Sequence, residues 1–322
     1  MEWKGRNVLV TGGAGFIGSH LVDALLARGA RVRVLDNLSN GKRENLAHCE
    51  KQIEFLEADI RDASVCRQAV SGVEYVFHQA ALGSVPRSMK DPSTSIAVNV
   101  SGTANVFAAA RDAGVRRVVY ASSSSVYGDS RKLPKREGEE GKPLSPYALS
   151  KAMNEQLADV FRRCDGMELV GLRYFNVYGP RQDPDGPYAA VIPRFFKAYL
   201  SGEAPVIYGD GEQSRDFTYV SDAVAANICG AEAPGEASGA AYNVAGGRQT
   251  TVNDLARAVR DAVGGGPEAR HEPPRKGDVL HSAADLSLSG RALAYAPSME
   301  LPNGLSRSLE HYRQAVGAAA RS

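Results

Sequence analysis

The feature of this sequence that most constrains its fold is the stretch NVLVTGGAGFIG at residues 7–18. Residues 8–10 form the short apolar run of a buried parallel strand, and the apolar positions after residue 16 have helical spacing. Between them, Gly12 permits a tight turn, Gly15 lets backbone approach a pyrophosphate, and Gly18 lets the helix pack on the strand. Because a helix N-terminus offers free N–H groups, the stretch predicts a dinucleotide-binding turn.

Acidic residues follow the next two expected strands, residues 31–36 and 53–56. Asp36 is placed to accept hydrogen bonds from an adenosine ribose, and its charge would repel a 2′-phosphate, so we expect NAD rather than NADP. The neighbouring basic residues soften this discrimination without reversing it. Asp59 is expected to reach the adenine amino group or to cap a helix.

The regular alternation of strand and helix patterns predicts an α/β fold with a Rossmann, doubly wound parallel sheet. Strands are expected at 8–10, 31–36, 53–56, 73–78, 118–121, 168–172 and 204–208. Helices are expected at 44–50, 62–70, 95–113, 146–163, 192–201, 251–263 and 305–316, with a surface loop at 230–241. Because 322 residues exceed the size of most single cores, we expect an NAD-binding domain over 1–175 and a smaller α/β substrate-binding domain over 176–322, with later segments able to cross back to the sheet.

Composition excludes several classes of partner. The net charge of +1 gives no basis for a nucleic-acid partner, and no apolar run is long enough to span a bilayer. The first strand begins too early to leave room for a signal peptide. The four cysteines lie far apart and the histidines show no metal-ligand spacing, so we expect reduced and mostly buried thiols, a cytoplasmic location and no metal site.

Tyr147 and Lys151 are expected to share one face of a helix, because they are four residues apart and Pro146 suits the first helical turn. An ordinary amphipathic pair would have the same spacing. A phenol with a pKa of about 10 is a poor base at neutral pH, but a nearby ammonium and a charged nicotinamide would lower that pKa. The serines at 122–125 follow an expected strand, at the sheet edge where α/β folds bind ligands.

From Val8 to near its C-terminus, the chain resembles the extended short-chain dehydrogenases/reductases of the nucleotide-sugar epimerase/dehydratase group. The matching segments are TGGAGFIG at 11–18, Asp36, SSSSVYG at 122–128, YALSK at 147–151, RYFNVYGPRQ at 173–182, GDGEQSRDFTYVSD at 209–222 and RKGD at 275–278. The resemblance implies a UDP-sugar substrate. It also implies a homodimer in which the helices at 95–113 and 146–163 form a four-helix bundle with their copies.

The resemblance implies a role for each matched residue. Tyr147 would be the acid/base, Ser123 would hydrogen-bond the sugar O4, and Lys151 would bind the nicotinamide ribose. The substrate diphosphate would be met by Asn176, Arg215 and Arg275, and the uridine ribose by Asp278. The further expected NAD contacts are Gly12, Gly15, Phe16, Ile17, Asp36, Asn37, Asp59, Ile60, Ala80, Ala81, Asn99, Ser122, Tyr174 and Asn176. The further expected substrate contacts are Ser84, Arg87, Ser124, Ser125, Ala190, Val191, Tyr208 and Ser282.

Two serines bear on the reaction within this group. The 4,6-dehydratases carry an Asp-Glu pair directly after the residue that corresponds to Ser123, and those acids serve the elimination of water. This chain has Ser124 and Ser125 there, so the resemblance favours 4-epimerisation. The sugar would be oxidised at C4, turned, and reduced on its other face, with NAD recycled in each turnover.

Ser282 and two loops bear on the choice of sugar. Residues 80–88 and 182–191 resemble loops of UDP-N-acetylglucosamine 4-epimerases. Ser282 stands where a bulky tyrosine fills the pocket of epimerases restricted to plain hexoses. The expected reaction therefore interconverts UDP-GlcNAc and UDP-GalNAc, with UDP-glucose and UDP-galactose as further substrates.

Three alternatives remain open. The enzyme could be a UDP-glucose 4-epimerase. It could be a UDP-uronic acid 4-epimerase in which Ser124 and Ser125 bind the C6 carboxylate. A non-catalytic NAD-binding regulator is disfavoured, because such proteins commonly lose the Tyr or the Lys and this chain keeps both.

Overall fold

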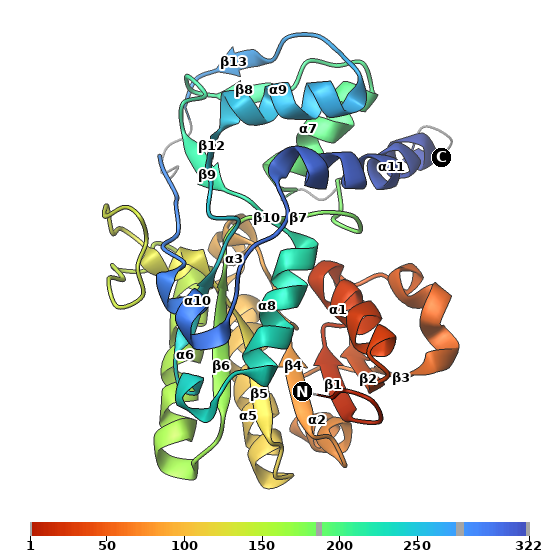
Figure 1. The fold of residues 1–322 in the computed structure, drawn as a ribbon, viewed down its shortest axis with the longest axis vertical. Helices are drawn as coiled ribbons and strands as arrows, with labels where there is room; N and C mark the ends of the chain where they lie inside the picture. The colour runs from red at the N-terminus through yellow and green to blue at the C-terminus, as the bar shows by residue number, and fades with distance from the viewer. Residues whose placement is uncertain (1, 185–188, 275–279, 320–322) are drawn as a thin grey trace.

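The computed structural model describes residues 2–184, 189–274 and 280–319, and its main element is a seven-stranded parallel sheet (Figure 1). In spatial order the strands are β11 (Ala241–Val244), β6 (Leu169–Tyr174), β5 (Arg117–Ser123), β4 (Tyr75–His78), β1 (Asn7–Thr11), β2 (Arg31–Asp36) and β3 (Ile53–Glu57). The Rossmann fold expected from the sequence is confirmed. β5 runs two residues further than expected, so Ser123 is the last residue of a strand.

Helices cover both faces of the sheet, which is why its strands are apolar on both sides. Side chains alternate along β1: Val8 and Val10 pack with α1 (Phe16–Ala27), α8 (Val220–Glu232) and α10 (Ser287–Leu293). Leu9 points to the other face, against α2 (Ala63–Val70), α5 (Thr103–Asp112) and α6 (Pro146–Asp165). The short helical segment η1 (Arg43–Gln52) lies between β2 and β3 in the sequence and contacts α1.

The helix expected at 95–113 begins earlier and is not uniform. It consists of α4 (Pro92–Ile96), the π-helical segment η2 (Ala97–Gly102) and α5, preceded by α3 (Val85–Lys90). Asp91 explains the earlier start, because its carboxylate accepts a hydrogen bond from the Thr94 N–H at 3.0 Å and caps α4. The π-helical turn carries the buried Asn99, whose side chain binds both the N–H and the carbonyl of Leu82.

A smaller lobe lies over the carboxyl ends of the sheet strands (Figure 1). It contains α7 (Val191–Leu200), α9 (Val252–Val263) and α11 (Leu301–Ala319), around a core that includes Phe196, Leu255 and Tyr312. Three short strand pairs accompany these helices: β7 (Val177–Tyr178) with β10 (Thr218–Tyr219), β9 (Ser214–Asp216) with β12 (Gln249–Thr251), and β8 (Val206–Tyr208) with β13 (Arg270–Glu272). Because α8, β11 and α10 pack on the large sheet, the chain crosses between the lobes more than once. The domain boundaries at 1–175 and 176–322 stay a prediction.

Two expectations about the second half of the chain need correction. Residues 230–241 are a surface loop only in part: residues 230–232 complete α8 and Ala231 is 1% exposed, whereas residues 234–236, at η4 (Gly235–Ala237), are exposed. The buried Arg117 guanidinium fixes this segment by donating to the carbonyl oxygens of Gly230 at 3.1 Å and Ala231 at 3.3 Å. The last helix, α11, starts at Leu301 rather than at residue 305.

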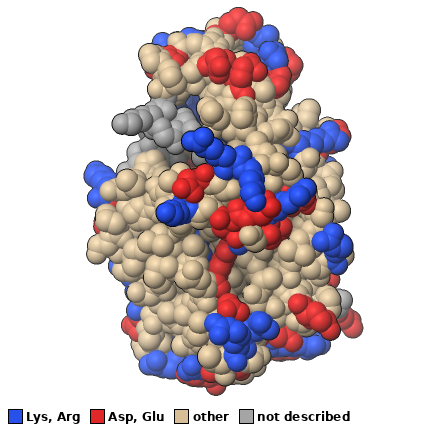
Figure 2. Space-filling view, turned by 90° about the vertical axis from the view of Figure 1, so that its left-hand side faces the viewer, with Lys and Arg blue, Asp and Glu red and all other residues tan. Residues whose placement is uncertain are grey.

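The exposed face in Figure 2 is mixed in charge, and the four cysteines differ in burial. Charged side chains of both signs are intermingled in Figure 2, and the lower half of that face has a wide uncharged area. No helix in the described ranges combines the length and the apolar character needed to cross a membrane. All four cysteines are free thiols. Cys49 and Cys66 are buried and Cys229 is partly buried, whereas Cys164 is exposed and departs from the expected burial.

Candidate active site

The glycine turn between β1 and α1 fits a dinucleotide phosphate. Gly12 has φ +68°, and a Cβ there would lie 2.6 Å from the Ala80 nitrogen; a Cβ at Gly18 would lie 2.1 Å from the Gly12 oxygen. Gly15 occupies the N-cap position of α1 without any side-chain cap, and the first turn holds no acidic residue. The first N–H groups of α1 are therefore open to an anion, as a dinucleotide-binding turn requires.

A first pocket, the Asp36 pocket, opens at the carboxyl ends of β1 to β4. It is lined by Gly12, Gly15, Asp36, Asn37, Asp59, Ile60, Ala80 and Ala81, all expected NAD contacts, and also by Asn40, Gly41, Gln79 and Leu82. The Asp36 carboxylate accepts hydrogen bonds from the N–H groups of Ala14 at 2.9 Å and Leu38 at 2.8 Å. Burial raises the pKa of Asp36, and these two hydrogen bonds oppose the rise. The acid is thereby held in one orientation in the pocket wall.

The helix-capping role considered for Asp59 belongs to Asp62 instead, and the adenine contact stays a prediction. Asp59 lines the Asp36 pocket and accepts from the Arg61 guanidinium at 3.0 and 2.8 Å and from the Asn37 amide at 2.7 Å. Its hydrogen bonds to Arg61 are the main cause that lowers the pKa of Asp59 to about 2. The cap of α2 is Asp62, which accepts from the Ser64 N–H at 2.8 Å.

A second pocket, the Tyr147 pocket, begins at the same glycine turn and reaches the ends of β5 and β6. It is lined by Gly12, Gly15, Phe16, Ile17, Ala81, Ser122, Ser123, Ser124, Tyr147, Lys151, Tyr174 and Asn176, together with Gln79, Arg181 and Asp183. Tyr147 lies in the first turn of α6, which Ser145 caps by accepting from the Ala148 N–H at 3.1 Å. The expected helix start is confirmed, and it places Tyr147 at the sheet edge.

Ser123, Tyr147 and Lys151 converge in this pocket. The Lys151 Nζ lies 6.0 Å from the centre of the Tyr147 ring and donates to the Ala121 carbonyl at 2.8 Å. Burial raises the pKa of Tyr147, and a hydrogen bond with Ser123 opposes it. Burial also lowers the pKa of Lys151 to about 8, opposed by the charge of Glu155.

The expected lowering of the Tyr147 pKa by Lys151 is therefore not found in the protein alone. Burial is the main influence on the pKa of this phenol, and the Lys151 ammonium, 6.0 Å from the ring centre, itself loses charge above pH 8. The positive charge of a bound oxidised nicotinamide would act in the required direction. The glycine turn, the uncapped helix and Asp36 all fit NAD.

The expected substrate residues divide between two places. Asn176 lies in the Tyr147 pocket in a left-handed conformation, with φ +36°, and its amide donates to the Asp216 carbonyl at 2.9 Å. Val191, Tyr208 and Arg215 line a third pocket in the smaller lobe, the Arg215 pocket, together with Ala189, Arg194 and Gln213. Ala190 is the N-cap residue of α7, directly before Val191.

Three expected substrate contacts lie close together in the sequence, within residues 275–282: Arg275, Asp278 and Ser282. The buried Ser282 lies near β9, because its N–H donates to the Ser214 carbonyl at 3.0 Å. Arg215 is the next residue of β9 and donates to the carbonyl of Leu280 at 3.3 Å. Arg275 and Asp278 lie outside the described residues, as do residues 185–188 of the loop at 182–191.

Four other expected contact residues have structural roles instead of lining these three pockets. Ser84 caps α3 by accepting from the Arg87 N–H at 3.2 Å, and the Arg87 guanidinium donates to Asn40 at 3.0 Å. The Asn99 side chain accepts from the Leu82 N–H and donates to the Leu82 carbonyl. The Ser125 hydroxyl is buried without a hydrogen-bond partner among the described residues, and its N–H donates to the Ser123 hydroxyl at 3.2 Å.

Sequence reasoning missed Gln79, which lines both the Asp36 and the Tyr147 pockets. Its side chain donates to Asn227 at 2.9 Å and accepts from the Tyr174 hydroxyl at 3.1 Å. The available signal was its position, because Gln79 directly follows the last residue of β4, where parallel strands present their ligand-binding residues.

Sequence spacing also missed a group of metal-type side chains. Asp23 of α1 and His48 and Cys49 of η1 have ligand atoms within 4.8 Å of one another. Asp23 pairs with His48 at 2.7 Å and with Arg181 at 2.8 Å. A cation there would compete with the Arg181 guanidinium, so the group is better explained as an ion-pair cluster.

Comparisons with known proteins agree with this site. Residues 8–245 match the NAD dependent epimerase/dehydratase family. The chain is 42% identical to a UDP-glucose 4-epimerase of Mycolicibacterium smegmatis, over 95% of this chain and 98% of that protein. A solved UDP-glucose 4-epimerase of Thermotoga maritima with UDP-glucose has a TM-score of 0.91 and 39% identity, covering 96% of this chain and 99% of that chain. A UDP-N-acetylglucosamine 4-epimerase of Methanobrevibacter ruminantium, solved with UDP-N-acetylmuramic acid, has a TM-score of 0.92 and 40% identity, covering 97% and 99%. With its glycine turn, its Ser-Tyr-Lys group and these matches, the chain belongs to the NAD dependent epimerase/dehydratase family.

Proposed function

We propose that this protein is an NAD-dependent UDP-sugar 4-epimerase that interconverts UDP-GlcNAc and UDP-GalNAc and also accepts UDP-glucose and UDP-galactose. The observation that carries the proposal is one pocket that contains both the dinucleotide turn and the Ser123, Tyr147 and Lys151 group. Serines at 124 and 125 supply no carboxylate for the elimination of water. The relatives named above are themselves 4-epimerases of UDP-sugars.

The residues of the pocket divide the work of C4 inversion. The Tyr147 oxygen accepts the proton of the sugar O4 during oxidation and returns it during reduction. Ser123 hydrogen-bonds the same oxygen, and the Lys151 ammonium favours the phenolate form of Tyr147. NAD, held at the glycine turn and Asp36, would supply the hydride acceptor and donor for C4. Asn176, at the rim, and Arg215 and Arg275 orient the diphosphate, a role for which a guanidinium is well suited.

The N-acetylated sugar is proposed because of Ser282. A small side chain at this position leaves room for a 2-acetamido group, which a tyrosine ring would fill. The similarity to an epimerase named for UDP-N-acetylglucosamine supports this choice, and the two similar enzymes named for UDP-glucose support the plain hexose as an alternative. A uronic acid is the remaining alternative, in which Ser124 would donate to the C6 carboxylate.

Epimerisation of four nucleotide sugars, followed at the C1 proton by NMR, tests the proposal. We expect turnover of UDP-GlcNAc and UDP-GalNAc, and slower turnover of UDP-glucose. Turnover of UDP-glucose without the acetylated pair would overturn the role of Ser282, and turnover of UDP-glucuronate alone would make Ser124 and Ser125 carboxylate-binding residues. Absence of turnover on all four would refute the proposed substrate class.

We also propose a cytoplasmic homodimer that pairs α5 and α6 with their copies. Leu149, Met153 and Val160 are 46%, 37% and 43% exposed and lie on one face of α6. An exposed apolar stripe of this kind favours a protein interface. The free thiols are consistent with a reducing compartment. Met153→Glu should convert the dimer into a monomer in analytical ultracentrifugation. Arg162→Glu, on another face of the same helix, should leave the dimer intact. An unchanged dimer in Met153→Glu would contradict this interface.

A further inference from the structure

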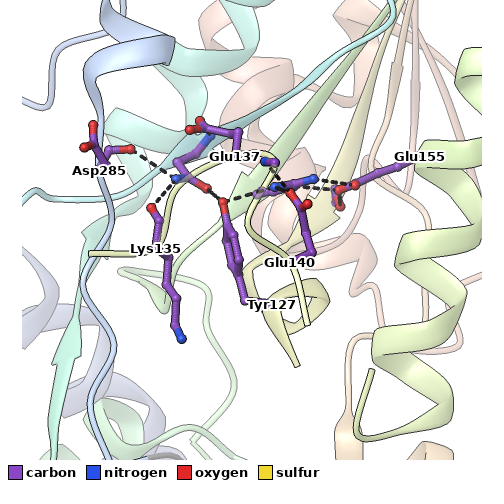
Figure 3. A network of polar contacts seen from close by, with 10 residues as sticks. Tyr127, Lys135, Glu137, Glu140, Glu155 and Asp285 are labelled. Carbon is purple, nitrogen blue, oxygen red and sulfur yellow. Dashed lines mark hydrogen bonds and ion pairs between the residues drawn. The ribbon is translucent and has the colours of Figure 1, made fainter. Parts of the chain in front are cut away.

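A network of buried and partly buried polar groups joins β6 to α6, the helix that carries Tyr147 and Lys151 (Figure 3). At its centre is Arg173 of β6, which is 6% exposed. Its guanidinium donates to both carboxylate oxygens of Glu155, at 2.9 and 2.7 Å, and to the Tyr127 hydroxyl at 3.0 Å. It also pairs with Glu140, from the segment after η3 (Ser124–Tyr127). In Figure 3, Glu155 and Glu140 approach from α6 and from this segment.

Glu155 is tied to the catalytic residues from two directions. It follows Lys151 by one turn of α6 and Tyr147 by two, so the three side chains share a helix face. Its carboxylate also accepts a hydrogen bond from the Ser122 hydroxyl. Ser122 lies in β5 between Ala121 and Ser123. The Ala121 carbonyl accepts the hydrogen bond from Lys151. The Glu155 carboxylate therefore binds β5 at Ser122, between the Ala121 carbonyl that binds Lys151 and the proposed catalytic residue Ser123.

The balance of charge explains why two carboxylates surround one arginine. Arg173 and Lys151 are cations, and Glu155 and Glu140 are anions, so the four groups together are neutral. Arg173 with both carboxylates alone would carry an excess negative charge. Among the described residues, the groups recorded against Lys151 are Glu155 and Tyr147 on α6, the Ala121 carbonyl of β5 and His78 on β4. Burial keeps His78 neutral by lowering its pKa to about 3, so Glu155 supplies the negative charge in this set.

We propose that Glu155 is a positioning residue of the active site, whose carboxylate orients Ser122 and Arg173 and faces Lys151 with the negative charge that keeps this buried ammonium protonated. The inference rests on the proposed function for its catalytic meaning, because a protonated Lys151 is what favours the Tyr147 phenolate. The contacts themselves exist whichever sugar is bound. Glu140 shares Arg173 with Glu155 but belongs to another segment, and so provides a matched control.

The direct test is a titration of the lysine side chains by NMR in the full-length protein carrying ¹³C-labelled lysine, with Lys151→Met to identify the signal. In the unchanged protein the Lys151 signal should titrate near pH 8, the value set by its burial. Glu155→Gln should lower this midpoint by about one pH unit, because an opposite charge is lost. Glu140→Gln should leave it unchanged, and Glu155→Asp should restore most of it. An unchanged midpoint in Glu155→Gln, or equal shifts in both glutamine variants, would overturn the proposal.

Activity gives a second readout. The alkaline limb of kcat/KM should move to lower pH in Glu155→Gln by the same interval as the titration midpoint, and should not move in Glu140→Gln. A loss of activity that is equal at every pH would contradict the proposal. If the protein epimerises none of the nucleotide sugars, the proposed function fails, while the lysine titration still decides the role of Glu155.

A second variant covers the case in which Glu155→Gln does not fold, since it leaves a buried arginine with one carboxylate fewer. The double change Glu155→Gln/Arg173→Gln removes both members of the bidentate pair. Because the double change also removes the positive charge of Arg173, it should lower the midpoint in the same direction as Glu155→Gln but by less. A midpoint that stays near pH 8 in it would overturn the proposal equally.

Discussion

The Asp36 pocket and the Arg215 pocket are built in opposite ways. The first lies at the ends of four neighbouring parallel strands, and its acid is held by backbone N–H groups of the adjoining turns. The second is assembled from helix α7 and from the three-residue strands β8 and β9, which pair with distant segments, such as β9 with β12. The proposed cofactor side is therefore set by local sequence and sheet topology, whereas the proposed substrate side depends on long-range packing.

The largest expected effect breaks the chemistry while leaving cofactor binding intact. Tyr147→Phe should reduce kcat about a thousandfold, because the acid/base of the C4 oxygen is lost. Bound NAD should remain, since the glycine turn and Asp36 are untouched. Tyr242→Phe is the control, because that hydroxyl binds the Ala237 carbonyl at 2.9 Å, outside the pockets described above. Equal kinetics for the Tyr147 variant and the unchanged enzyme would remove Tyr147 from the mechanism.

The next effect sharpens the substrate side of the comparison. Ser282→Tyr should lower kcat/KM for UDP-GlcNAc relative to UDP-glucose by about a hundredfold, because the ring occupies the space for the acetamido group. Ser282→Ala serves as the control and should leave the ratio within a few-fold. Competition between the two sugars in one NMR sample measures the ratio directly. A ratio unaffected by the tyrosine would show that the acetamido group lies elsewhere.

A smaller effect concerns the pH dependence of stability that the buried His78 of β4 causes. His78 is 3% exposed, bonded to Thr11 at 2.7 Å and Thr103 at 2.9 Å, and burial lowers its pKa to about 3. Because the unfolded value is about 6.5, the unfolded chain binds more protons between these values, and stability falls as pH falls below 6.5. The loss should reach about 2 kcal/mol at pH 5. Urea unfolding at pH 7 and pH 5 measures it, and His78→Gln should have a correspondingly smaller pH dependence.

The smallest expected effect concerns the choice between the two dinucleotides. Asp36→Asn should weaken NAD binding about tenfold and strengthen NADP binding, because the acid binds the ribose and repels a 2′-phosphate. Glu57→Gln, at the end of the neighbouring β3, is the control. Calorimetric titration with each dinucleotide gives both affinities. A variant that still rejects NADP would assign the discrimination to other residues of the turn.

Features that depend on local sequence could be predicted, whereas features that depend on long-range packing could not. Gly12, Asp36 and the start of α6 at Pro146 were predictable, because each depends on a local conformation or on the end of a strand. The buried helical end of α8 was not, since its small residues are held by Arg117 from a strand far away in the sequence. The pairing of Glu155 with Arg173 and the meeting of Asp23 with His48 likewise depend on tertiary packing, which spacing does not reveal.

The central claim is that inversion at C4 proceeds by transient oxidation within one pocket. The most direct measurement follows UDP-GlcNAc that carries deuterium at C4 through epimerisation in ordinary water, with the product read by NMR and mass spectrometry. The deuterium should remain at C4 of the UDP-GalNAc formed, because the C4 hydrogen never exchanges with solvent during transient oxidation. Loss of the label to water would show instead that C4 is inverted by proton abstraction.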